Sequence, residues 1–307
     1  MAEAHTDVEK LSTRVKAECR ANVPLANLCT FRIGGPADIL AEPKNDAEAL
    51  ELVNALADLQ IPWMVLGGGS NVLIGDGGIR GCVIKLAGTL NRVVISDDGK
   101  TVDVGAGANF AKLTKTCMAL GWPRSNGWIG TPGTVGGALI MNAGSREGEV
   151  GECVNSVRVI SDREVVELSR EQCGFVYRNS TFPKQSLLLS VKLSCNNADS
   201  SQSEHIAELA RLSLQRRHKT QPKEHSAGSI FKNPPGTFAG KLLEEAGLKG
   251  RHSGGALVSP THANFIVNTG GATARDVVTL AEECQRVVLE RTGIQLEWEV
   301  KRIGEFT

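Results

Sequence analysis

The sequence lacks a surplus of charge of either sign. Its 307 residues contain 34 Lys and Arg and 34 Asp and Glu residues, so the formal net charge at pH 7 is zero. A protein that binds nucleic acid or an anionic membrane through its overall charge normally carries a positive surplus. We therefore expect no nucleic-acid partner, although the composition still allows a local basic pocket.

The spacings typical of metal sites and disulfide frameworks are also missing. The six histidines show no ligand spacing, and the eight cysteines include no C-x-x-C pair. These spacings argue against a zinc site and against a redox dithiol, so we assign no residue to a metal. The scattered cysteines are Cys19, Cys29, Cys82, Cys117, Cys153, Cys173, Cys195 and Cys284.

Neither a secretory signal nor a membrane helix is evident. Residues 1–7 have no basic start and no apolar core. The stretch 125–145 contains no charged residue, but glycines and Pro132 interrupt it, and it lacks the bulky apolar character of a spanning helix. We therefore expect a cytoplasmic protein without membrane insertion, whose thiols are reduced and fill core space.

What the sequence does contain is the pattern of an α+β fold with many short strands and few helices. Helical spacing of apolar residues marks the helices, and short apolar or alternating runs mark the strands. Helices are predicted over 46–59, over 110–120, through Ile206, Leu209 and Leu212, and from Thr273, where Asp276 completes a capping-box signature. Strands are predicted over 63–66, 82–86, 92–96, 101–104, 156–160, 164–168, 187–193 and 296–303. The polar run 196–203 is the preferred domain boundary.

Two glycine-rich, charge-free segments indicate a site for one large ligand. Residues 67–71 read Gly-Gly-Gly-Ser-Asn between two predicted strands, and residues 130–144 form the second segment. Glycines let the backbone approach a ligand closely, and successive backbone N–H groups can form an anion-binding nest. A diphosphate joined to a flat ring would fit two such loops. For each loop alone, a tight structural turn is the alternative.

Familiar phosphate-binding motifs match poorly. The segment 105–110 begins like a dinucleotide fingerprint, but Phe110 occupies the place of the third glycine. Gly236 is one residue too close to Gly240-Lys241 for a P-loop, and Leu242 replaces the Ser or Thr. Neither a Rossmann domain nor a nucleoside triphosphatase is favoured.

Three further segments carry reactive side chains. Residues 177–180 contain the only tyrosine, and residues 226–234 place a hydroxyl, an ammonium and an amide group close together. On the final predicted strand, Glu297 and Glu299 share one face. Each of these groups taken alone is more often a satisfied surface or turn group.

Together, these segments resemble the UDP-N-acetylenolpyruvoylglucosamine reductase family, flavoenzymes of bacterial peptidoglycan synthesis. The resemblance runs from about Leu25 to Gly304, and the stretch from Tyr177 to Leu193 is similar to the subtype that lacks an extra tyrosine-bearing loop. In family order, the matching segments are 30–37, 67–71, 132–137, 177–180, 227–234, 239–242, 262–265 and Glu299-Val300. Cys29, Thr131, Ser145 and His225 depart from the family's usual residues, and none of them removes a reactive group.

The resemblance implies an α+β fold with a two-lobed FAD-binding region of the vanillyl-alcohol-oxidase type and a smaller α/β substrate domain. The FAD-binding region would span 20–196, with lobes of about 20–88 and 89–196. The substrate domain would span 203–295, and residues 296–304 would form a strand that returns to the FAD-binding region.

The resemblance also implies the activity. Hydride would pass from NADPH to a non-covalently bound FAD, and then from the flavin to the vinyl carbon of the UDP-linked enolpyruvyl ether, forming UDP-N-acetylmuramate. Ser229 is the implied proton donor, and Arg178 and Glu299 are the implied stabilisers of the enolic intermediate. The implied substrate-binding residues are Tyr177, Arg178, Lys232, Asn233 and Lys241. The implied cofactor-binding residues are Arg32, Gly67, Gly68, Gly69, Ser70, Asn71, Gly130, Pro132, Gly133, Thr134, Gly136, Gly137, Asn142 and Ala143.

Two other functions stay open at this point. A related flavoprotein oxidase would use oxygen and would oxidise a sugar or an alcohol. A non-catalytic nucleotide-binding regulator could keep the fold, but it would be expected to lose Ser229, Arg178 or Glu299, and all three are present.

Overall fold

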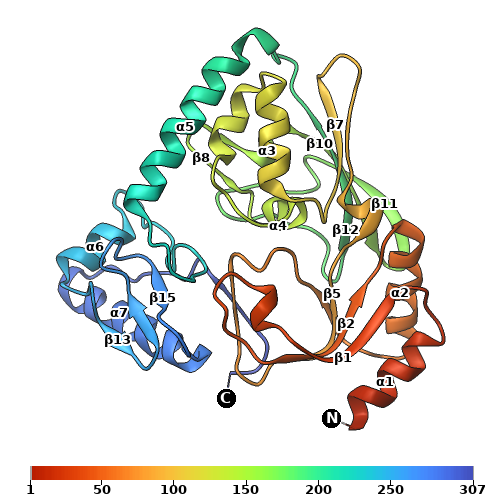
Figure 1. Ribbon diagram of the computed structural model, residues 1–307, viewed down its shortest axis with the longest axis horizontal. Helices are drawn as coiled ribbons and strands as arrows, with labels where there is room; N and C mark the ends of the chain where they lie inside the picture. The colour runs from red at the N-terminus through yellow and green to blue at the C-terminus, as the bar shows by residue number, and fades with distance from the viewer. Residues whose placement is uncertain (1, 307) are drawn as a thin grey trace. The chain divides into compact units, whose positions relative to one another are not determined.

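The computed structural model describes residues 2–306, which form two compact units (Figure 1). The first unit contains the residues up to Ala21 together with Ile39–Gly68 and Cys82–Arg216. The second unit contains Asn22–Asp38, Gly69–Gly81 and the chain from Arg217 onward. Each unit is therefore assembled from segments that are far apart in the sequence. The division at 196–203 inferred from composition stays a prediction.

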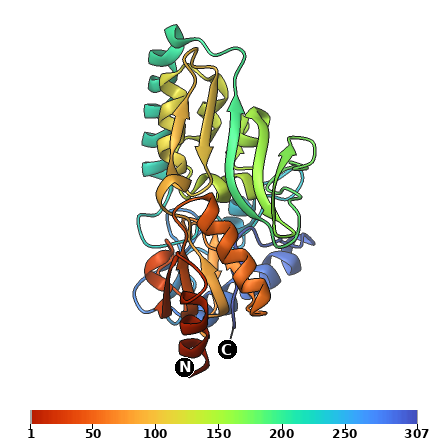
Figure 2. The ribbon, with the colours of Figure 1, turned by 90° about the vertical axis from the view of Figure 1, so that its right-hand side faces the viewer.

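The larger sheet of the first unit has five antiparallel strands in the order β11-β10-β12-β7-β6. Helices α3 and α4 lie beside this sheet (Figures 1 and 2). Val102 and Val104 of β7 share one buried cluster with Phe110 and Leu113 of α3 and Val135 of α4. The elements are β6 (Val93–Ile95), β7 (Thr101–Gly105), β10 (Val154–Ser161), β11 (Glu164–Ser169), β12 (Leu187–Ser194), α3 (Phe110–Ala119) and α4 (Val135–Ile140).

A four-stranded sheet with the order β1-β2-β5-β3 accompanies helix α2. Ala49, Leu52 and Leu56 of α2 are buried in one cluster with Ile39 and Ile84 from the sheet. The Asn45 side chain accepts the backbone N–H of Glu48 and so caps the first turn of α2. The elements are β1 (Glu18–Pro24), β2 (Pro36–Glu42), β3 (Trp63–Val65), β5 (Ile79–Ile84) and α2 (Asp46–Asp58), and α1 (Ala2–Ser12) precedes them.

The second unit contains a three-stranded antiparallel sheet, β13-β14-β15, against which α7 packs. A separate parallel pair joins β4 to β16, with Val72 opposite Lys301. The elements are β4 (Val72–Ile74), α6 (Ala239–Glu245), β13 (His252–Ser253), β14 (Ala256–Val258), β15 (Ile266–Asn268), α7 (Ala274–Thr292) and β16 (Lys301–Ile303). Helix α5 (Ser203–Thr220) carries the chain into this unit.

The predicted α+β class is confirmed, and most predicted elements lie where the apolar pattern placed them. The capping box of Thr273 and Asp276 at the start of α7 is present. Two expectations need correction. The strand predicted over 296–303 is regular only over Lys301–Ile303, because Trp298 pairs in an isolated bridge with Phe231 instead. Helix α5 forms, but Leu209 and Leu212, whose spacing predicted it, are exposed.

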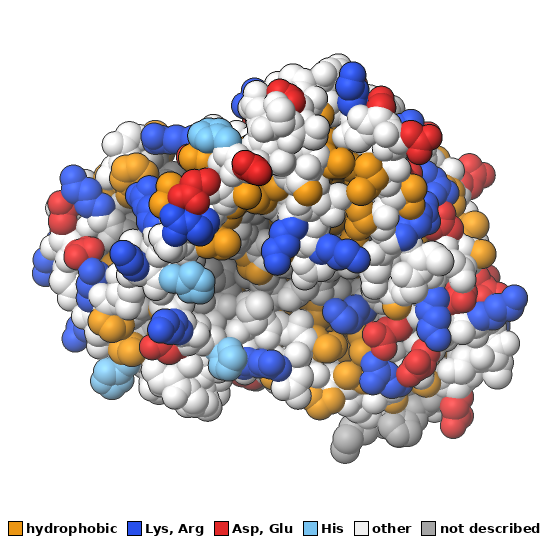
Figure 3. All heavy atoms as spheres, turned by 45° about the horizontal axis from the view of Figure 1, so that its top comes forward, with side chains coloured by type: hydrophobic (Ala, Val, Ile, Leu, Met, Phe, Trp, Pro, Cys, Tyr) orange, Lys and Arg blue, Asp and Glu red, His pale blue; other side chains and the backbone are white. Residues whose placement is uncertain are grey.

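The surface matches the balanced composition. Figure 3 shows Lys and Arg side chains interspersed with Asp and Glu over the face that it presents. Among residues 2–306, no helix combines the length and the apolar character needed to cross a membrane.

Candidate active site

The two glycine-rich loops meet inside the first unit. A Cβ atom added to Gly68 would lie 2.6 Å from Cα of Gly133, and one added to Gly67 would lie 2.5 Å from Oγ1 of Thr134. Within the described chain, the backbone N–H groups of Gly67, Gly68 and Gly133 donate to no protein acceptor. Two loops that the sequence placed far apart therefore present unpaired donors next to each other, as a diphosphate site requires.

The second loop is held rigidly while its outer residues stay exposed. The N–H of Val135 donates to the carbonyl of Ala108 (2.9 Å), and the N–H of Gly136 donates to that of Ala106 (2.7 Å). Thr134 caps α4, because its hydroxyl oxygen accepts the N–H of Gly137 (3.3 Å). Gly130, Pro132 and Gly137 are exposed. A ligand can therefore reach this backbone, and the backbone needs no reorganisation to meet it.

The remainder of the first loop belongs to the second unit. The carbonyl of Gly69 accepts the N–H of Thr30 (3.0 Å), and Gly69 has a φ of +61°, which favours glycine. Nδ2 of Asn71 donates to the carbonyl of Glu299 (3.2 Å), and the N–H of Lys301 donates to the carbonyl of Asn71 (3.0 Å). These contacts connect Asn71 to the segment that carries the predicted catalytic Glu299. Ser70 lies between them, partly buried.

Arg32 has a strained backbone that its neighbours hold in place. Its φ is +57°, which a non-glycine residue adopts only at a cost. The buried Asn268 donates from Nδ2 to the carbonyls of Phe31 (3.1 Å) and Arg32 (3.4 Å). Nη1 of Arg32 donates to the carbonyl and to Oδ1 of Asn27, each at 3.1 Å. The exposed guanidinium is thereby directed by side chains of the same unit.

A pocket of about 610 Å³ opens in the second unit, and three of the predicted residues line it. Ser229, Asn233 and Lys241 share this pocket with residues of α6 and of the segment 261–264. Oδ1 of Asn233 accepts the N–H of Ala239 (3.1 Å), which fixes the loop before α6. The structure thus brings together one predicted catalytic residue and two predicted substrate-binding residues.

Ser229 and Glu299 lie on neighbouring segments. The N–H of Glu299 donates to the carbonyl of Ile230 (2.8 Å), and the N–H of Ile230 donates to the carbonyl of Asn264 (2.8 Å). The buried Asn264 side chain bonds Phe231 on both sides, because Oδ1 accepts its N–H (3.0 Å) and Nδ2 donates to its carbonyl (2.8 Å). The Ser229 segment is therefore held between two others.

The lysines of this region are already paired with carboxylates. Nζ of Lys232 lies 3.1 Å from Oε2 of Glu297, and Nζ of Lys241 lies 3.8 Å from Oε1 of Glu245. Both pairs are largely exposed, so each contributes little to stability. Either lysine can therefore exchange its carboxylate for an anionic ligand at small cost.

Two pocket residues escaped the sequence analysis as individual sites. His262 lines the pocket, its ring packs edge-on against Phe265 with centroids 4.9 Å apart, and Nδ1 accepts the N–H of Asn264 (3.2 Å). Burial lowers the pKa of His262, so the imidazole is neutral near pH 7 and its proton is on Nε2. Phe238 also lines the pocket and is 56% exposed. His262 lies in the family-matching segment 262–265 and Phe238 lies in none, but no pattern gave either residue a role, because the pocket joins segments distant in sequence.

Tyr177 and Arg178 belong to the first unit, where they form the tip of a tight turn. The Arg178 guanidinium carbon lies 5.2 Å from the centroid of the Tyr177 ring, and Nη1 donates to the carbonyl of Gly144 (2.9 Å). Asn142 and Ala143 precede Gly144, and both are buried. Both amide protons of Asn142 are bound by Glu149 and Val176, and its backbone N–H donates to the carbonyl of Leu139 (3.1 Å), so a contact with a cofactor would use its backbone carbonyl.

The described residues give no support for a metal-binding group or for a reactive cysteine thiol. Within residues 2–306, no three His, Cys, Asp or Glu side chains gather as a metal ion would need. The cysteines are free thiols, and all except the half-buried Cys19 are buried. Burial raises the pKa of Cys153 and of Cys284 to about 12, so both stay protonated and poorly nucleophilic.

Comparison with known proteins decides the family. The family described as "UDP-N-acetylenolpyruvoylglucosamine reductase, C-terminal domain" matches residues 221–303, and the family described as "FAD binding domain" matches residues 37–169. A UDP-N-acetylenolpyruvoylglucosamine reductase of Anaeromyxobacter sp. (strain Fw109-5) is 39% identical over 298 residues, which cover 97% of this chain and 92% of that protein. The chain belongs to the UDP-N-acetylenolpyruvoylglucosamine reductase family.

Further relatives of the reductase family agree. A reductase of Myxococcus xanthus (strain DK1622) is 38% identical over 303 residues, covering 96% of this chain and 97% of that protein. The crystal structure of the UDP-N-acetylenolpyruvylglucosamine reductase from Thermus caldophilus superposes with a TM-score of 0.78 at 35% identity, covering 94% of this chain and 98% of that one. The chain is an FAD-dependent oxidoreductase, which confirms the predicted enzyme class and FAD as its cofactor.

The glycine loops fit this cofactor. A side chain at Gly67 or Gly68 would collide with the second loop, and the unpaired N–H groups of Gly67, Gly68 and Gly133 suit the two phosphates of FAD. The individual assignments of the cofactor-binding, catalytic and substrate-binding residues stay predictions. The subtype inferred from the stretch between Tyr177 and Leu193 stays a prediction as well.

Proposed function

We propose that this protein reduces UDP-N-acetylenolpyruvoylglucosamine to UDP-N-acetylmuramate with NADPH as the hydride donor, in the cytoplasmic synthesis of peptidoglycan precursors. The names of the relatives support the substrate. One structural observation carries the proposal furthest: Ser229, Asn233 and Lys241 line one pocket, and the segment of Glu299 is hydrogen-bonded to the segment of Ser229.

Ser229 is the proposed general acid. When bound, FAD supplies the hydride chemistry that connects NADPH with the enolpyruvyl ether. The substrate carbon next to the carboxylate then becomes enolic and must take up a proton. The hydroxyl of Ser229 is a weak acid in water, but it suffices against such a carbon, and a positioned donor typically accelerates proton transfer by about 10²–10⁴-fold.

Arg178 and Glu299 are the proposed stabilisers of this intermediate. A guanidinium can bind a carboxylate at two points and lower the energy of charge that develops next to it. Glu299 is held by its backbone bond to Ile230 and by the bond that its carbonyl accepts from Asn71. A carboxylic acid at this place can share a proton with the enolic oxygens.

Tyr177, Lys232, Asn233 and Lys241 are the proposed contacts to the sugar and the diphosphate. The lysines attract phosphate as point charges, and Asn233 offers an amide on a fixed loop. We propose that NADPH and the enolpyruvyl nucleotide occupy this region in turn, since both carry a diphosphate. Steady-state rates should then give parallel double-reciprocal lines.

The absorbance spectrum of the FAD-loaded protein tests the function directly. Under anaerobic conditions, NADPH should bleach the flavin band, and the enolpyruvyl nucleotide should restore it with formation of UDP-N-acetylmuramate. Failure of the nucleotide to restore the band would overturn the proposal. Rapid oxygen consumption with a sugar in its place would favour a related oxidase. NADH in a parallel titration tests the choice of hydride donor.

The proposal includes non-covalent FAD. The loop 67–71 contains no histidine or cysteine that could form a bond to the flavin. Acid precipitation should therefore release the flavin into the supernatant, and flavin retained in the pellet would contradict this part.

A further inference from the structure

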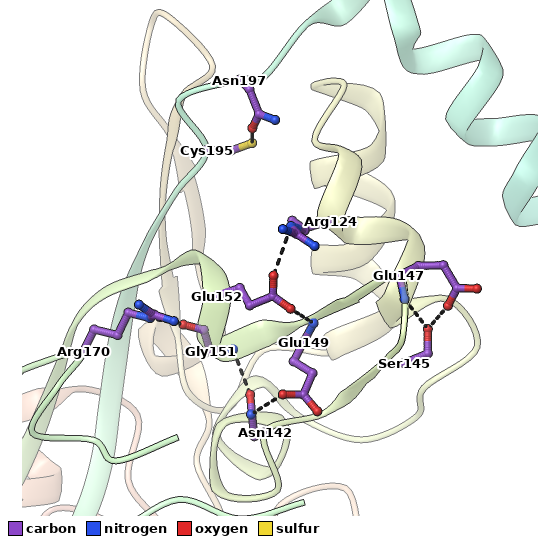
Figure 4. A network of polar contacts seen from close by, with 10 residues as sticks. All are labelled: Arg124, Asn142, Ser145, Glu147, Glu149, Gly151, Glu152, Arg170, Cys195 and Asn197. Carbon is purple, nitrogen blue, oxygen red and sulfur yellow. Dashed lines mark hydrogen bonds and ion pairs between the residues drawn. The ribbon is translucent and has the colours of Figure 1, made fainter. Parts of the chain in front are cut away.

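The side chain of Asn142 takes part in a polar network of the first unit, and Figure 4 shows it directed at Glu149 and Gly151. It is 3% exposed. Nδ2 donates to Oε2 of Glu149 (2.7 Å) and to the carbonyl of Val176 (3.1 Å), while Oδ1 accepts the N–H of Gly151 (3.0 Å). One buried amide therefore ties three separate segments together, and both of its protons are used.

The surroundings of Asn142 allow little movement. A Cβ atom added to Gly151 would lie 2.6 Å from Cγ of Phe175 and 2.8 Å from Oδ1 of Asn142, so Gly151 is closely packed. Nε of Arg170 donates to the carbonyl of Gly151 (2.7 Å). Glu149 takes part in a capping box with Glu152, which fixes the Glu149 backbone beside the network. The amide of Asn142 thus has a rigid frame on one side.

On its other side, Asn142 holds the turn that carries Arg178. Val176 and Asn179 exchange two backbone bonds, of 3.0 and 3.1 Å, which make residues 176–179 a tight turn. Arg178 has a φ of +55° at the third position, where such turns usually place Gly or Asn. The carbonyl of Val176 accepts from both Asn179 and Asn142, so its two lone pairs are occupied.

The loop of Asn142 also contacts the end of the Arg178 side chain. Nη1 of Arg178 donates to the carbonyl of Gly144, two residues after Asn142 (2.9 Å). The segment 142–144 is therefore hydrogen-bonded to the base of the turn at Val176 and to the guanidinium of Arg178 at its tip. Strained backbone of this kind persists only where the surroundings over-determine it, and it is concentrated at functional sites.

We propose that Asn142, supported by Glu149, is a positioning residue that sets the conformation of the Val176–Asn179 turn and thereby aims the Arg178 guanidinium. The inference rests on the proposed function, because the catalytic role of Arg178 belongs to it. The side chain of Asn142 acts on the reaction only through Arg178 and does not itself contact the substrate.

Asn142→Asp is the decisive variant. The carboxylate keeps an acceptor for Gly151 but offers no proton to Glu149 or Val176, and it places two like charges together. Since a misplacement of about 1 Å can cost on the order of 10²-fold in rate, flavin recovery with the enolpyruvyl nucleotide should slow by roughly that factor. At saturating NADPH, flavin bleaching should slow far less than recovery, because no enolic intermediate forms in that step. The flavin-to-protein ratio is measured as well, since Asn142 is itself among the predicted cofactor-binding residues.

The same substitution at Asn197 is the matched control. Asn197 is exposed in the same unit, and its Oδ1 accepts only from Sγ of Cys195 (3.1 Å), a contact that a carboxylate preserves. Asn197→Asp should therefore leave both half-reactions unchanged.

Glu149→Gln weakens the network more gently, because Oε1 can still accept from Asn142 without the charge. It should slow recovery less than Asn142→Asp. The variant that combines both substitutions should regain part of the loss, since the amide introduced at position 149 can donate to the carboxylate introduced at position 142.

Two further readouts distinguish positioning from general damage. Tyr177 is the only tyrosine, so a ring-labelled tyrosine gives one NMR signal from a ring that lies 5.2 Å from the Arg178 guanidinium. That signal should shift in Asn142→Asp and stay in place in Asn197→Asp. In an Arg178→Lys background, Asn142→Asp should add little further loss, since both changes disturb the same group.

An unmoved Tyr177 signal, or unchanged flavin recovery in Asn142→Asp, would overturn the inference. Equal slowing of both half-reactions would overturn it as well, because it would show a general disturbance of the site. Failure of the proposed function is recognised separately: the parent protein itself would then show no recovery with the enolpyruvyl nucleotide, while the Tyr177 signal would still report on the turn.

Discussion

Ser229 is the residue on which the proposed mechanism can be tested most sharply. Ser229→Ala removes one oxygen from a partly buried side chain, so folding and FAD content should survive. In stopped flow, bleaching by NADPH should stay close to the parent, because that step needs no serine proton. Colour recovery with the enolpyruvyl nucleotide should slow by about 10²–10⁴-fold.

Ser229→Cys supplies the control for this prediction, since a thiol can also donate a proton and should restore part of the rate. If both half-reactions slow equally in Ser229→Ala, the residue shapes a shared binding site and is not the acid. If neither slows, another group donates the proton, and Glu299 becomes the next candidate.

His262 predicts a pH dependence of stability. Burial, helped by Lys249 and opposed by Glu244, lowers its pKa below the ordinary value. Between the folded and the unfolded pKa the unfolded chain binds more protons, so this contribution is complete above about pH 6.5 and is lost as the pH falls through the lowered value. His262→Gln should therefore make the free energy of unfolding less dependent on pH between about 7.5 and 5.

Urea denaturation of both proteins with saturating FAD measures this difference. The change in slope with pH is the relevant quantity, because the substitution also alters packing against Phe265. A parent and a variant with parallel pH profiles would show that His262 takes up its proton equally well in the folded and unfolded states.

Single residues differed in how far the sequence revealed them. Ser229, Asn233 and Lys241 carried a family pattern and meet in one pocket. His262 lies in the family-matching segment 262–265, but neither it nor Phe238 was assigned a role, although both line the same pocket, since a histidine or a phenylalanine near a turn is usually a packing residue. Their place in the site depends on contacts between α6 and the segment 261–264, which no local pattern encodes.

At the scale of elements, the contact between the two glycine loops gives a graded prediction. In Gly68→Ala the new methyl group meets the backbone of Gly133 at 2.6 Å, and backbone cannot rotate away. In Gly67→Ala it meets only the Thr134 hydroxyl at 2.5 Å. Overpacking of this kind costs about 1–3 kcal/mol, so Gly68→Ala should lose FAD more readily than Gly67→Ala.

The matched test adds Thr134→Ala to each variant. This change removes the obstacle for Gly67→Ala and leaves the obstacle for Gly68→Ala in place. Because Thr134 is itself a predicted cofactor-binding residue and caps α4, Thr134→Ala alone is the reference, and only the variant with Gly67→Ala should match its FAD content. The flavin-to-protein ratio after desalting measures the effect. Equal rescue of both variants would mean that the loops separate easily and that their contact does not shape the cofactor site.

Helix α7 shows what a sequence can and cannot reveal about an element. Its capping box, Thr273 with Asp276, was predictable because both residues lie within one turn. The N–H groups of Ala274 and Arg275 bond instead to Oδ1 (2.8 Å) and Oδ2 (3.1 Å) of Asp76. That carboxylate belongs to a distant loop, so no local pattern pointed to it. Similarly, the irregular end of the predicted strand 296–303 depends on a bridge to Phe231.

At the scale of the whole molecule, thiol reactivity reports on folding. The chain has 8 cysteines, and only Cys19 is partly exposed. Burial, with a contribution from Glu18, raises the pKa of Cys19 to about 11, so even this thiol is a weak nucleophile near pH 7. A disulfide reagent such as Ellman's reagent should modify the native protein slowly, at Cys19 first, and should modify every thiol in urea.

Cys19→Ala is the control, and it should abolish the first phase without changing the remainder. If several thiols of the native protein reacted at once, the other cysteines would be more accessible to the reagent than their buried positions imply.

The overall class was accessible from the sequence, since the glycine loops, the apolar periodicity and the capping box are local signals. The assembly of each unit from segments far apart in the sequence was not accessible. Val72 pairs with Lys301, and Gly75 donates its N–H to Ile303 (2.9 Å), but a short strand such as β4 carries no mark of its partner. Pairing between two short strands that are so far apart in the sequence depends on the tertiary structure and not on a local pattern.

The parallel pairing of β4 with β16 affects how the protein folds during its synthesis on the ribosome. Val72 is translated long before Lys301, its partner in the sheet. At synthesis rates of about 5–20 residues per second, the nascent β4 waits roughly 10–45 s before its neighbour exists. Throughout that interval its hydrogen-bonding edge is open to any other extended peptide. The pair can form only after Lys301–Ile303 have been synthesised, and a chain interrupted before Lys301 would leave β4 without its partner.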